Sequence, residues 1–210
     1  MPVRLKCRSP ARSWEGGTKL ATIINLRGCS GSGKTWVVRA VAGHFDRMIP
    51  LGASIDRPHG YELSGNSKPI TYLVGSYGNV CGGCDTIKTQ DDACGRVRGY
   101  AGHGNVIFEG LMISTIFERY RALDRELTAA GHRYIWAFLD TPLDLCLERV
   151  QQRRNDRSDA RPFDPKLTTA KWELMRSIEF KARHAGLETA WVPSNEEGAA
   201  TVLRWLREGV

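Results

Sequence analysis

The chain has 210 residues, of which 41% are hydrophobic and 25% are charged, as is usual for one globular α/β domain. No apolar run approaches the roughly 20 residues of a membrane span, so we expect no membrane contact. The formal net charge of +7 and the clustered arginines favour a polyanionic partner. Residues 1–19 are basic and lack the apolar centre of a secretory signal, which predicts a basic N-terminal arm and a cytoplasmic protein.

A glycine-rich loop follows the first apolar segment, residues 20–26. It reads Gly28-Cys29-Ser30-Gly31-Ser32-Gly33-Lys34-Thr35 and opens onto an apolar segment that begins at Trp36. This pattern between a strand and a helix is typical of a loop that binds the phosphates of a nucleoside triphosphate. Loop N–H groups and the helix N-terminus attract phosphate, Lys34 would reach the β- and γ-phosphates, and Thr35 would ligate Mg²⁺. We therefore expect ATP and Mg²⁺ as cofactors.

Short apolar segments alternate with helical patterns along the rest of the chain. We expect strands over residues 48–55, 69–75, 105–108, 134–139 and 187–192, with a polar loop over residues 58–68. Helices are predicted over residues 114–130, 142–154, 165–185 and about 196–207. This alternation predicts a parallel sheet with helices on both faces, which binds its ligands at the carboxyl ends of the strands.

Acidic residues follow two of these predicted strands. Glu109 ends the strand over residues 105–108 and is expected to hold Mg²⁺, directly or through water, or to orient the nucleophile. Asp56 follows the second strand, where it would accept a proton from an attacking hydroxyl or form a turn before Arg57. Asp85 is a third candidate, and the residues leave open which of the three carboxylates acts as the base.

Two arginines lie four residues apart on one face of a predicted helix. Arg149 and Arg153 belong to a basic stretch that we interpret as a lid over about residues 149–164. Arginines that close over a transferring phosphoryl group stabilise its charge. The alternative interpretation is a solvated basic helix end.

Residues 75–92 contain four glycines, which let a backbone approach a ligand closely. Tyr77 offers a stacking face, while Asn79, Asp85 and Lys88 offer hydrogen bonds and charge. We interpret this segment, within an acceptor region of about residues 57–103, as the site for a nucleic-acid base, which can be flipped out of a duplex. The alternative is a surface loop in which Asp85 caps a helix.

Six cysteines in a chain expected to be cytoplasmic argue against a disulfide framework. Cys81 and Cys84, with Cys94 and His103 downstream, allow a zinc site, but the spacing is not diagnostic and packing is the default interpretation. Cys29 lies in the glycine-rich loop, and Cys146 is interpreted as incidental.

The glycine-rich loop, the segment Val106-Ile107-Phe108-Glu109-Gly110 and the Arg149/Arg153 pair together resemble the nucleoside and nucleotide kinases, a group that includes thymidylate kinase. The resemblance implies a single P-loop kinase domain over residues 20–210: three α/β/α layers, a five-stranded parallel sheet in the order 2-3-1-4-5, and an arginine-bearing lid. Glu109-Gly110-Leu111 stands where thymidylate kinases carry an Asp-Arg-Tyr/His signature.

Within this group, residues 77–85 are most similar to bacteriophage kinases that act on 5-hydroxymethyluracil already in DNA. This implies ATP-dependent phosphorylation of the hydroxymethyl group in the viral DNA inside the host cytoplasm, a step in thymine hypermodification that evades host restriction. Three alternatives stay open: a kinase of free nucleoside monophosphates such as thymidylate, a polynucleotide 5′-end kinase, and a non-catalytic nucleotide-dependent switch or DNA-binding module.

Overall fold

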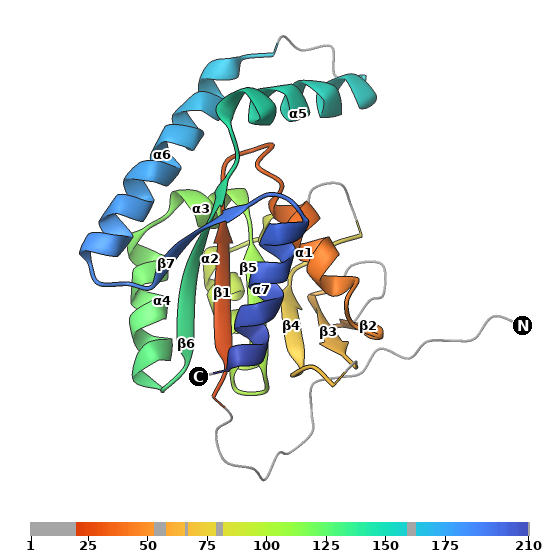
Figure 1. The fold of residues 1–210 in the computed structure, drawn as a ribbon, viewed down its shortest axis with the longest axis vertical. Coiled ribbons are helices and arrows are strands. Elements are labelled where there is room, and N and C mark those ends of the chain that lie inside the picture. Colours follow the sequence, from red (N-terminus) through yellow and green to blue (C-terminus); the bar gives the residue numbers. More distant parts are fainter. Residues whose placement is uncertain (1–19, 53–57, 66, 79–81, 159–162, 210) are drawn as a thin grey trace, which may run out of the picture.

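The computed structural model describes residues 20–52, 58–65, 67–78, 82–158 and 163–209 (Figure 1). Its centre is a seven-stranded sheet in the order β2-β3-β4-β5-β1-β6-β7. The strands are β1 (Thr22–Arg27), β2 (Arg47–Leu51), β3 (Gly60–Ser64), β4 (Thr71–Val74), β5 (Asn105–Glu109), β6 (Arg133–Asp140) and β7 (Thr189–Pro193).

Helices cover both faces of this sheet and make three layers. The helices are α1 (Lys34–Ala42), α2 (Gln90–Ala101), α3 (Leu111–Thr115), α4 (Glu118–Ala129), α5 (Leu143–Asp156), α6 (Pro165–His184) and α7 (Glu196–Glu208). Helices α1 and α7 pack on one face, whereas α2, α3, α4 and α6 pack on the other. The predicted α/β architecture with helices on both faces is confirmed. Among the described residues, no helix is long and apolar enough to cross a membrane.

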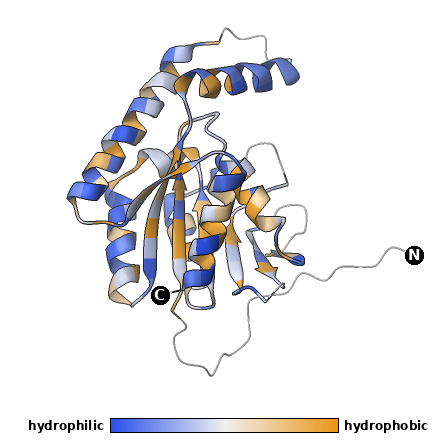
Figure 2. Cartoon of the chain, viewed as in Figure 1, coloured by the Kyte–Doolittle hydropathy of each residue, from blue (hydrophilic) through white to orange (hydrophobic). Residues whose placement is uncertain are grey.

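Five neighbouring strands, β4-β5-β1-β6-β7, run parallel to one another. The central strands are buried on both faces, and every residue of β1 and β5 is buried. Such strands need apolar side chains in both directions, which explains why they stand out in the sequence as short apolar runs. The hydrophobic colouring of the sheet interior shows the same pattern (Figure 2).

The predicted five-stranded, all-parallel sheet is incomplete: numbered in chain order among themselves, the five parallel strands lie in the order 2-3-1-4-5, but two further strands extend the sheet. Strands β2 and β3 form an antiparallel pair, and β3 also runs antiparallel to β4, so the sheet is mixed and has seven strands. Strand β3 lies inside residues 58–68, which were predicted to be a polar loop. The prediction missed this strand because Leu63 is its only large side chain that is fully buried. Strand β2 is at the sheet edge, where Pro50 fits because an edge strand leaves some N–H positions unpaired.

The helix predicted over residues 114–130 is two helices, α3 and α4, separated at residues 116–117. The buried guanidinium of Arg27 stabilises this break by donating hydrogen bonds to the carbonyl oxygens of Ser114 (3.2 Å) and Ile116 (3.1 Å). Its cation lies over the rings of Trp136 and Tyr120, at 3.9 and 5.4 Å from their centroids. Burial lowers the pKa of Arg27 to about 9.

Helix α2 was not predicted. Its first turn consists of acidic and amide residues, and two glycines lie further along the helix; both features obscure its helical pattern. A stripe of small and apolar residues nevertheless packs on the sheet: Ala93, Cys94, Val97 and Ala101. The Thr89 hydroxyl caps the helix by accepting a hydrogen bond from the Asp92 N–H.

Helix α5 lies beyond the carboxyl ends of the parallel strands (Figure 1). Its residues are mostly exposed or half-buried, and Cys146 is the residue that it buries completely. This placement brings the arginine-bearing helix over the edge of the sheet at which the glycine-rich loop follows β1.

Candidate functional site

The glycine-rich loop between β1 and α1 is tightly packed against α5. Gly31 and Gly33 have φ values of +81° and +93°, a region that side chains disfavour. A Cβ atom on Gly31 would lie 2.2 Å from the carbonyl oxygen of Cys146, so only glycine fits there. The loop carbonyl of Ser32 accepts a hydrogen bond from the Thr141 hydroxyl at 2.8 Å. These contacts fix the loop in a shape that the backbone alone would not hold.

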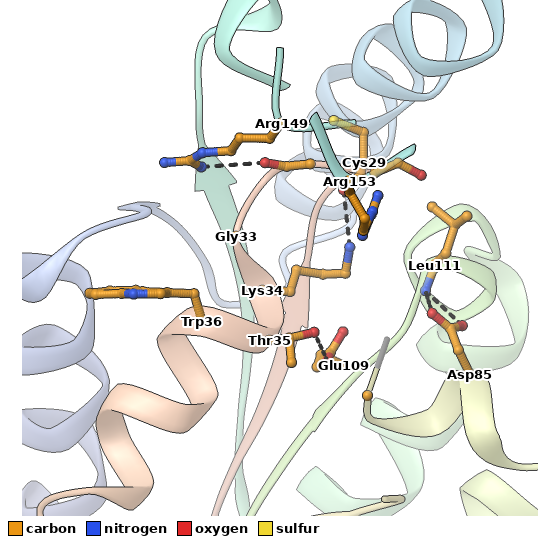
Figure 3. Close-up of a pocket in the computed structure, with 13 residues that line it drawn as sticks. Cys29, Gly33, Lys34, Thr35, Trp36, Asp85, Glu109, Leu111, Arg149 and Arg153 are labelled. Atoms are coloured by element: carbon orange, nitrogen blue, oxygen red, sulfur yellow. Dashed lines mark hydrogen bonds between the residues drawn. The ribbon is translucent and has the colours of Figure 1, made fainter. Parts of the chain in front are cut away.

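The side chains of Lys34 and Thr35, at the end of the loop, both contact other residues of the predicted site. The Lys34 ammonium donates hydrogen bonds to the carbonyl oxygens of Gly28 (2.8 Å) and Cys29 (3.1 Å). The Thr35 hydroxyl donates to Glu109 Oε1 at 2.8 Å (Figure 3). The loop and the end of β5 are therefore joined directly, as the adjacency of β1 and β5 requires.

Glu109 is buried, with 1% of its surface exposed. Burial raises the pKa of this carboxyl group to about 7, although the charge of Lys34 and the hydrogen bond from Thr35 act in the opposite direction. A carboxyl group with this pKa changes its protonation state near neutral pH. It becomes a carboxylate readily when a cation is placed beside it.

Arg149 links α5 to the loop and to the end of β7. Its Nη1 atom donates hydrogen bonds to the carbonyl oxygen of Gly31 (3.3 Å) and to Ser194 Oγ (3.4 Å). Arg153, one turn further along α5, lies above Lys34 (Figure 3). Both guanidinium groups therefore lie beside the glycine-rich loop.

These groups surround a cavity of about 270 Å³. Its lining contains ten residues that the sequence predicted as site residues: Cys29, Ser30, Gly31, Gly33, Lys34, Thr35, Asp85, Glu109, Arg149 and Arg153. It also contains Trp36, Gly82 and Leu111, which were not among the predicted site residues. The other two loop residues, Gly28 and Ser32, lie outside this lining, where Gly28 N–H donates to Ser114 Oγ at 3.1 Å.

Asp85 combines the two interpretations given to it. Both of its carboxylate oxygens accept a hydrogen bond from the Leu111 N–H, each at 2.9 Å, so the residue caps α3. The carboxylate also lines the cavity and is exposed to solvent. Asp85 and Glu109 are the carboxylates that line this cavity in the described parts of the chain.

The structure does not gather all the residues predicted to bind the acceptor. Tyr77 is 5% exposed and packs in the core beside α1, so it presents no open face for stacking in this structure. Burial raises the pKa of its hydroxyl, which has no hydrogen-bond partner in the described structure. Lys88 is exposed and does not line the cavity. Asp56 and Asn79 lie outside the described residues.

Zinc binding is not supported. Cys84 is buried, and its thiol donates a weak hydrogen bond to the carbonyl oxygen of Val74 at 3.8 Å. Cys94 lies in α2 and packs in the hydrophobic core. The segments that the structure describes contain no group of three or more potential metal ligands, and Cys81 lies outside them.

A second cavity, of about 430 Å³, adjoins the first through three shared residues: Gly33, Trp36 and Arg149. Its remaining lining comes from residues 194–196, between β7 and α7. Asn195 holds this turn by accepting hydrogen bonds from the N–H groups of Glu197 (3.1 Å) and Gly198 (3.2 Å). The sequence signal for this part of the site is the polar turn at the carboxyl end of the last strand, whose residues were not predicted as site residues.

Fold and site together define an α/β protein in which a phosphate-loop motif, an acidic strand end and two arginines share one edge of a mostly parallel sheet. Residues 21–196 match the model of the 5-hmdU DNA kinase family, and the chain belongs to this family.

Its relatives include proteins of several bacteriophages. The "5-hmdU DNA kinase" of Pseudomonas phage PaMx11 is 34% identical over 190 residues, which cover 89% of this chain and 97% of the relative. The protein of the same name from Pseudomonas phage M6 is 36% identical over 146 residues, covering 62% and 71%. That of Delftia phage PhiW-14 is 28% identical over 181 residues, covering 80% and 67%.

Proposed function

We propose that this protein is an ATP-dependent kinase that phosphorylates the hydroxymethyl group of 5-hydroxymethyluracil within phage DNA. The observation that carries the proposal is the single cavity in which Lys34, the Thr35–Glu109 pair and Arg149 meet, all within the residues that match the family. In the reaction, the hydroxyl oxygen bonds to the γ-phosphorus and the bond to the β-phosphate oxygen breaks, which releases ADP.

The two adjoining cavities fit the two parts of ATP. Phosphates would lie on the loop over residues 28–35, where backbone N–H groups and the N-terminus of α1 attract negative charge. The adenine would occupy the second cavity, because Trp36 is 44% exposed there and Arg149 spans both cavities. An aromatic ring and a guanidinium plane both stack well on a nucleotide base.

The Thr35 hydroxyl and the Glu109 carboxyl group fit Mg²⁺, which prefers oxygen ligands. We place the ion with these two residues, Glu109 acting directly or through water. Mg²⁺ neutralises charge on the phosphates when it is bound. The chain contributes the hydroxyl, the carboxyl group whose pKa of about 7 allows it to ionise there, and the Lys34 ammonium nearby.

Asp85 is our candidate for the group that orients or deprotonates the acceptor hydroxyl. It lines the cavity and is held in place by the N–H of Leu111, whereas Glu109 is engaged by Thr35. A carboxylate within hydrogen-bonding reach of an alcohol can accept its proton as the phosphoryl group transfers. Asp56, Asn79 and Lys88 stay candidates within an acceptor region of about residues 57–103.

Arg149 and Arg153 would close over the transferring phosphoryl group as part of a lid over about residues 149–164. Their place in the cavity lining supports this role, since guanidinium groups stabilise charge that develops on phosphoryl oxygens. A single kinase domain over residues 20–210, acting in the host cytoplasm, is the arrangement that we propose.

The acceptor is tested with covalently closed circular DNA that contains 5-hydroxymethyluracil. Such DNA has no 5′ ends, so labelled phosphate transferred from ATP to it would mark the base. The matched control is the same circle with thymine, and a third reaction supplies linear thymine DNA with free 5′-hydroxyl ends. Free thymidylate is the fourth acceptor.

We expect label on the circle that contains 5-hydroxymethyluracil and none on the thymine circle. Label on linear ends alone would instead identify a 5′-end kinase, and label on thymidylate alone would identify a nucleotide kinase. Phosphate on the hydroxymethyl carbon is a better leaving group than hydroxide. The product would therefore suit displacement reactions that hypermodify thymine and evade host restriction.

A further inference from the structure

The glycine-rich loop and helix α5 each contribute a buried cysteine to one contact. Cys29 lies in the loop and Cys146 in α5, 117 residues apart in the chain, yet their Sγ atoms are 3.5 Å apart. The two residues are 2% and 0% exposed. The adjacent Gly31 also packs against the backbone of Cys146. The contact therefore belongs to the fitted surface between the loop and α5.

We propose that Cys29 and Cys146 form an oxidisable dithiol, a modification site at which a peroxide joins the glycine-rich loop to α5 through a disulfide bond. The sulfur atoms would have to approach by about 1.5 Å to reach the length of a disulfide bond. Rotations of the two side chains, together with a small shift of the loop toward α5, provide a movement of this size. Disulfides of this kind in reducing surroundings are transient and regulatory.

The surroundings of the pair assign different roles to the two thiols. The hydrogen bond with Cys146 lowers the pKa of Cys29, burial acts in the opposite direction, and the positive charge of Lys34 lowers it further. The same hydrogen bond and burial raise the pKa of Cys146. Cys29 also lines the cavity of about 270 Å³, through which a small oxidant can reach it (Figure 3). Cys29 is therefore the attacking thiolate, and Cys146 is the thiol that resolves the product.

The reaction balances with hydrogen peroxide as the oxidant. The Cys29 thiolate attacks one peroxide oxygen, the O–O bond breaks, and a sulfenic acid and hydroxide form. The Cys146 sulfur then attacks the Cys29 sulfur, the S–O bond breaks, and water leaves with the thiol proton. Hydroxide takes up the proton that Cys29 had released. Two thiols lose two electrons in total, and one peroxide becomes two waters.

The disulfide would draw the loop out of its present position, toward the helix that carries Arg149. Lys34 would be affected as well, because its ammonium donates to the carbonyl oxygen of Cys29. We expect phosphoryl transfer to fall about a hundredfold, the scale of loss that accompanies a misplacement of about 1 Å at a reacting centre. This consequence rests on the proposed function, whereas formation of the disulfide does not.

The test treats the full chain with hydrogen peroxide, blocks the remaining thiols and maps the digested protein by mass spectrometry. We expect one crosslinked pair of peptides, which contain Cys29 and Cys146, and its disappearance after treatment with a thiol reductant. In Cys146→Ala the crosslink should be lost and dimedone should trap a sulfenic acid on Cys29. Cys94→Ala, which changes a buried cysteine of α2, is the matched control and should crosslink like the wild type.

Absence of the crosslink in the oxidised wild type, or pairing of Cys29 with another cysteine, would overturn the proposal. That measurement needs no variant, so a folding defect in Cys146→Ala cannot obscure it. A crosslink in a protein that phosphorylates no DNA would leave the modification site standing and remove the proposed function. DNA phosphorylation without a crosslink would support the proposed function and remove the modification site.

Discussion

Replacing Glu109 with glutamine should make the protein more stable at neutral and alkaline pH while it removes activity. The side chain is 1% exposed, and burial raises the pKa of its carboxyl group from 4.5 to about 7. Glutamine has nearly the same shape, and its Oε1 atom can still accept the hydrogen bond from Thr35. The substitution therefore removes the cost of ionising a buried group and keeps the packing.

The magnitude follows from the linkage between proton binding and folding. Because the folded-state pKa is raised, the folded protein holds its proton longer than the unfolded chain does. The stability from this group is complete below about pH 4.5 and is lost as the pH rises through about 7. The shift corresponds to about 3 kcal/mol of unfolding free energy, which the wild type loses at high pH and the glutamine variant keeps. For a domain of this size, that is a difference in Tm of roughly 6–12 °C above about pH 8.

The assay is urea unfolding of wild type and Glu109→Gln, without nucleotide, between about pH 4 and pH 8. The difference in unfolding free energy should grow in favour of the variant as the pH rises. Glu126→Gln is the matched control because Arg98 holds the pKa of Glu126 below its usual value, which gives the opposite sign. Addition of Mg²⁺ and ATP should stabilise the wild type more than Glu109→Gln, since a cation favours the carboxylate.

A free-energy difference between wild type and Glu109→Gln that stays constant across this pH range would refute the reasoning. It would mean that the pKa of Glu109 is the same in the folded protein as in the unfolded chain. A variant that loses stability at every pH would show that the hydrogen bond from Thr35 needs the charge.

Three further substitutions test the site and its surroundings. Lys34→Ala should lower phosphoryl transfer by at least about a hundredfold in the labelled-DNA assay, and retained transfer would remove the glycine-rich loop from the mechanism. Asp85→Asn keeps an oxygen to cap Leu111, so kcat should fall about a hundredfold while the KM for ATP holds; an unchanged kcat would point to another carboxylate. Tyr77→Phe removes a buried hydroxyl that has no partner in the described structure, so urea unfolding should show about 1–2 kcal/mol of added stability, and a loss would reveal a missed hydrogen bond.

The strands and the glycine-rich loop could be predicted because their signals are local. A strand buried on both faces is an apolar run, and a phosphate-binding loop needs glycines at fixed spacings before Lys34 and Thr35. Strand β3 has neither signal, because its burial depends on the neighbouring strands β2 and β4. Helix α2 was missed for a similar reason. Its two glycines weaken the helix, and packing of its small and apolar residues on the sheet offsets that loss.

The sequence by itself determined which chemical groups are available: the glycine-rich loop, an acidic end to the strand over residues 105–109, and two arginines one helical turn apart. It could not decide which of these groups meet, because residues far apart in the chain approach only through strand order and helix packing. The adjacency of β1 and β5 places Thr35 2.8 Å from Glu109, and the fit of α5 on the loop places Cys146 beside Cys29. The same packing buries Tyr77, which the sequence had offered as an open stacking face.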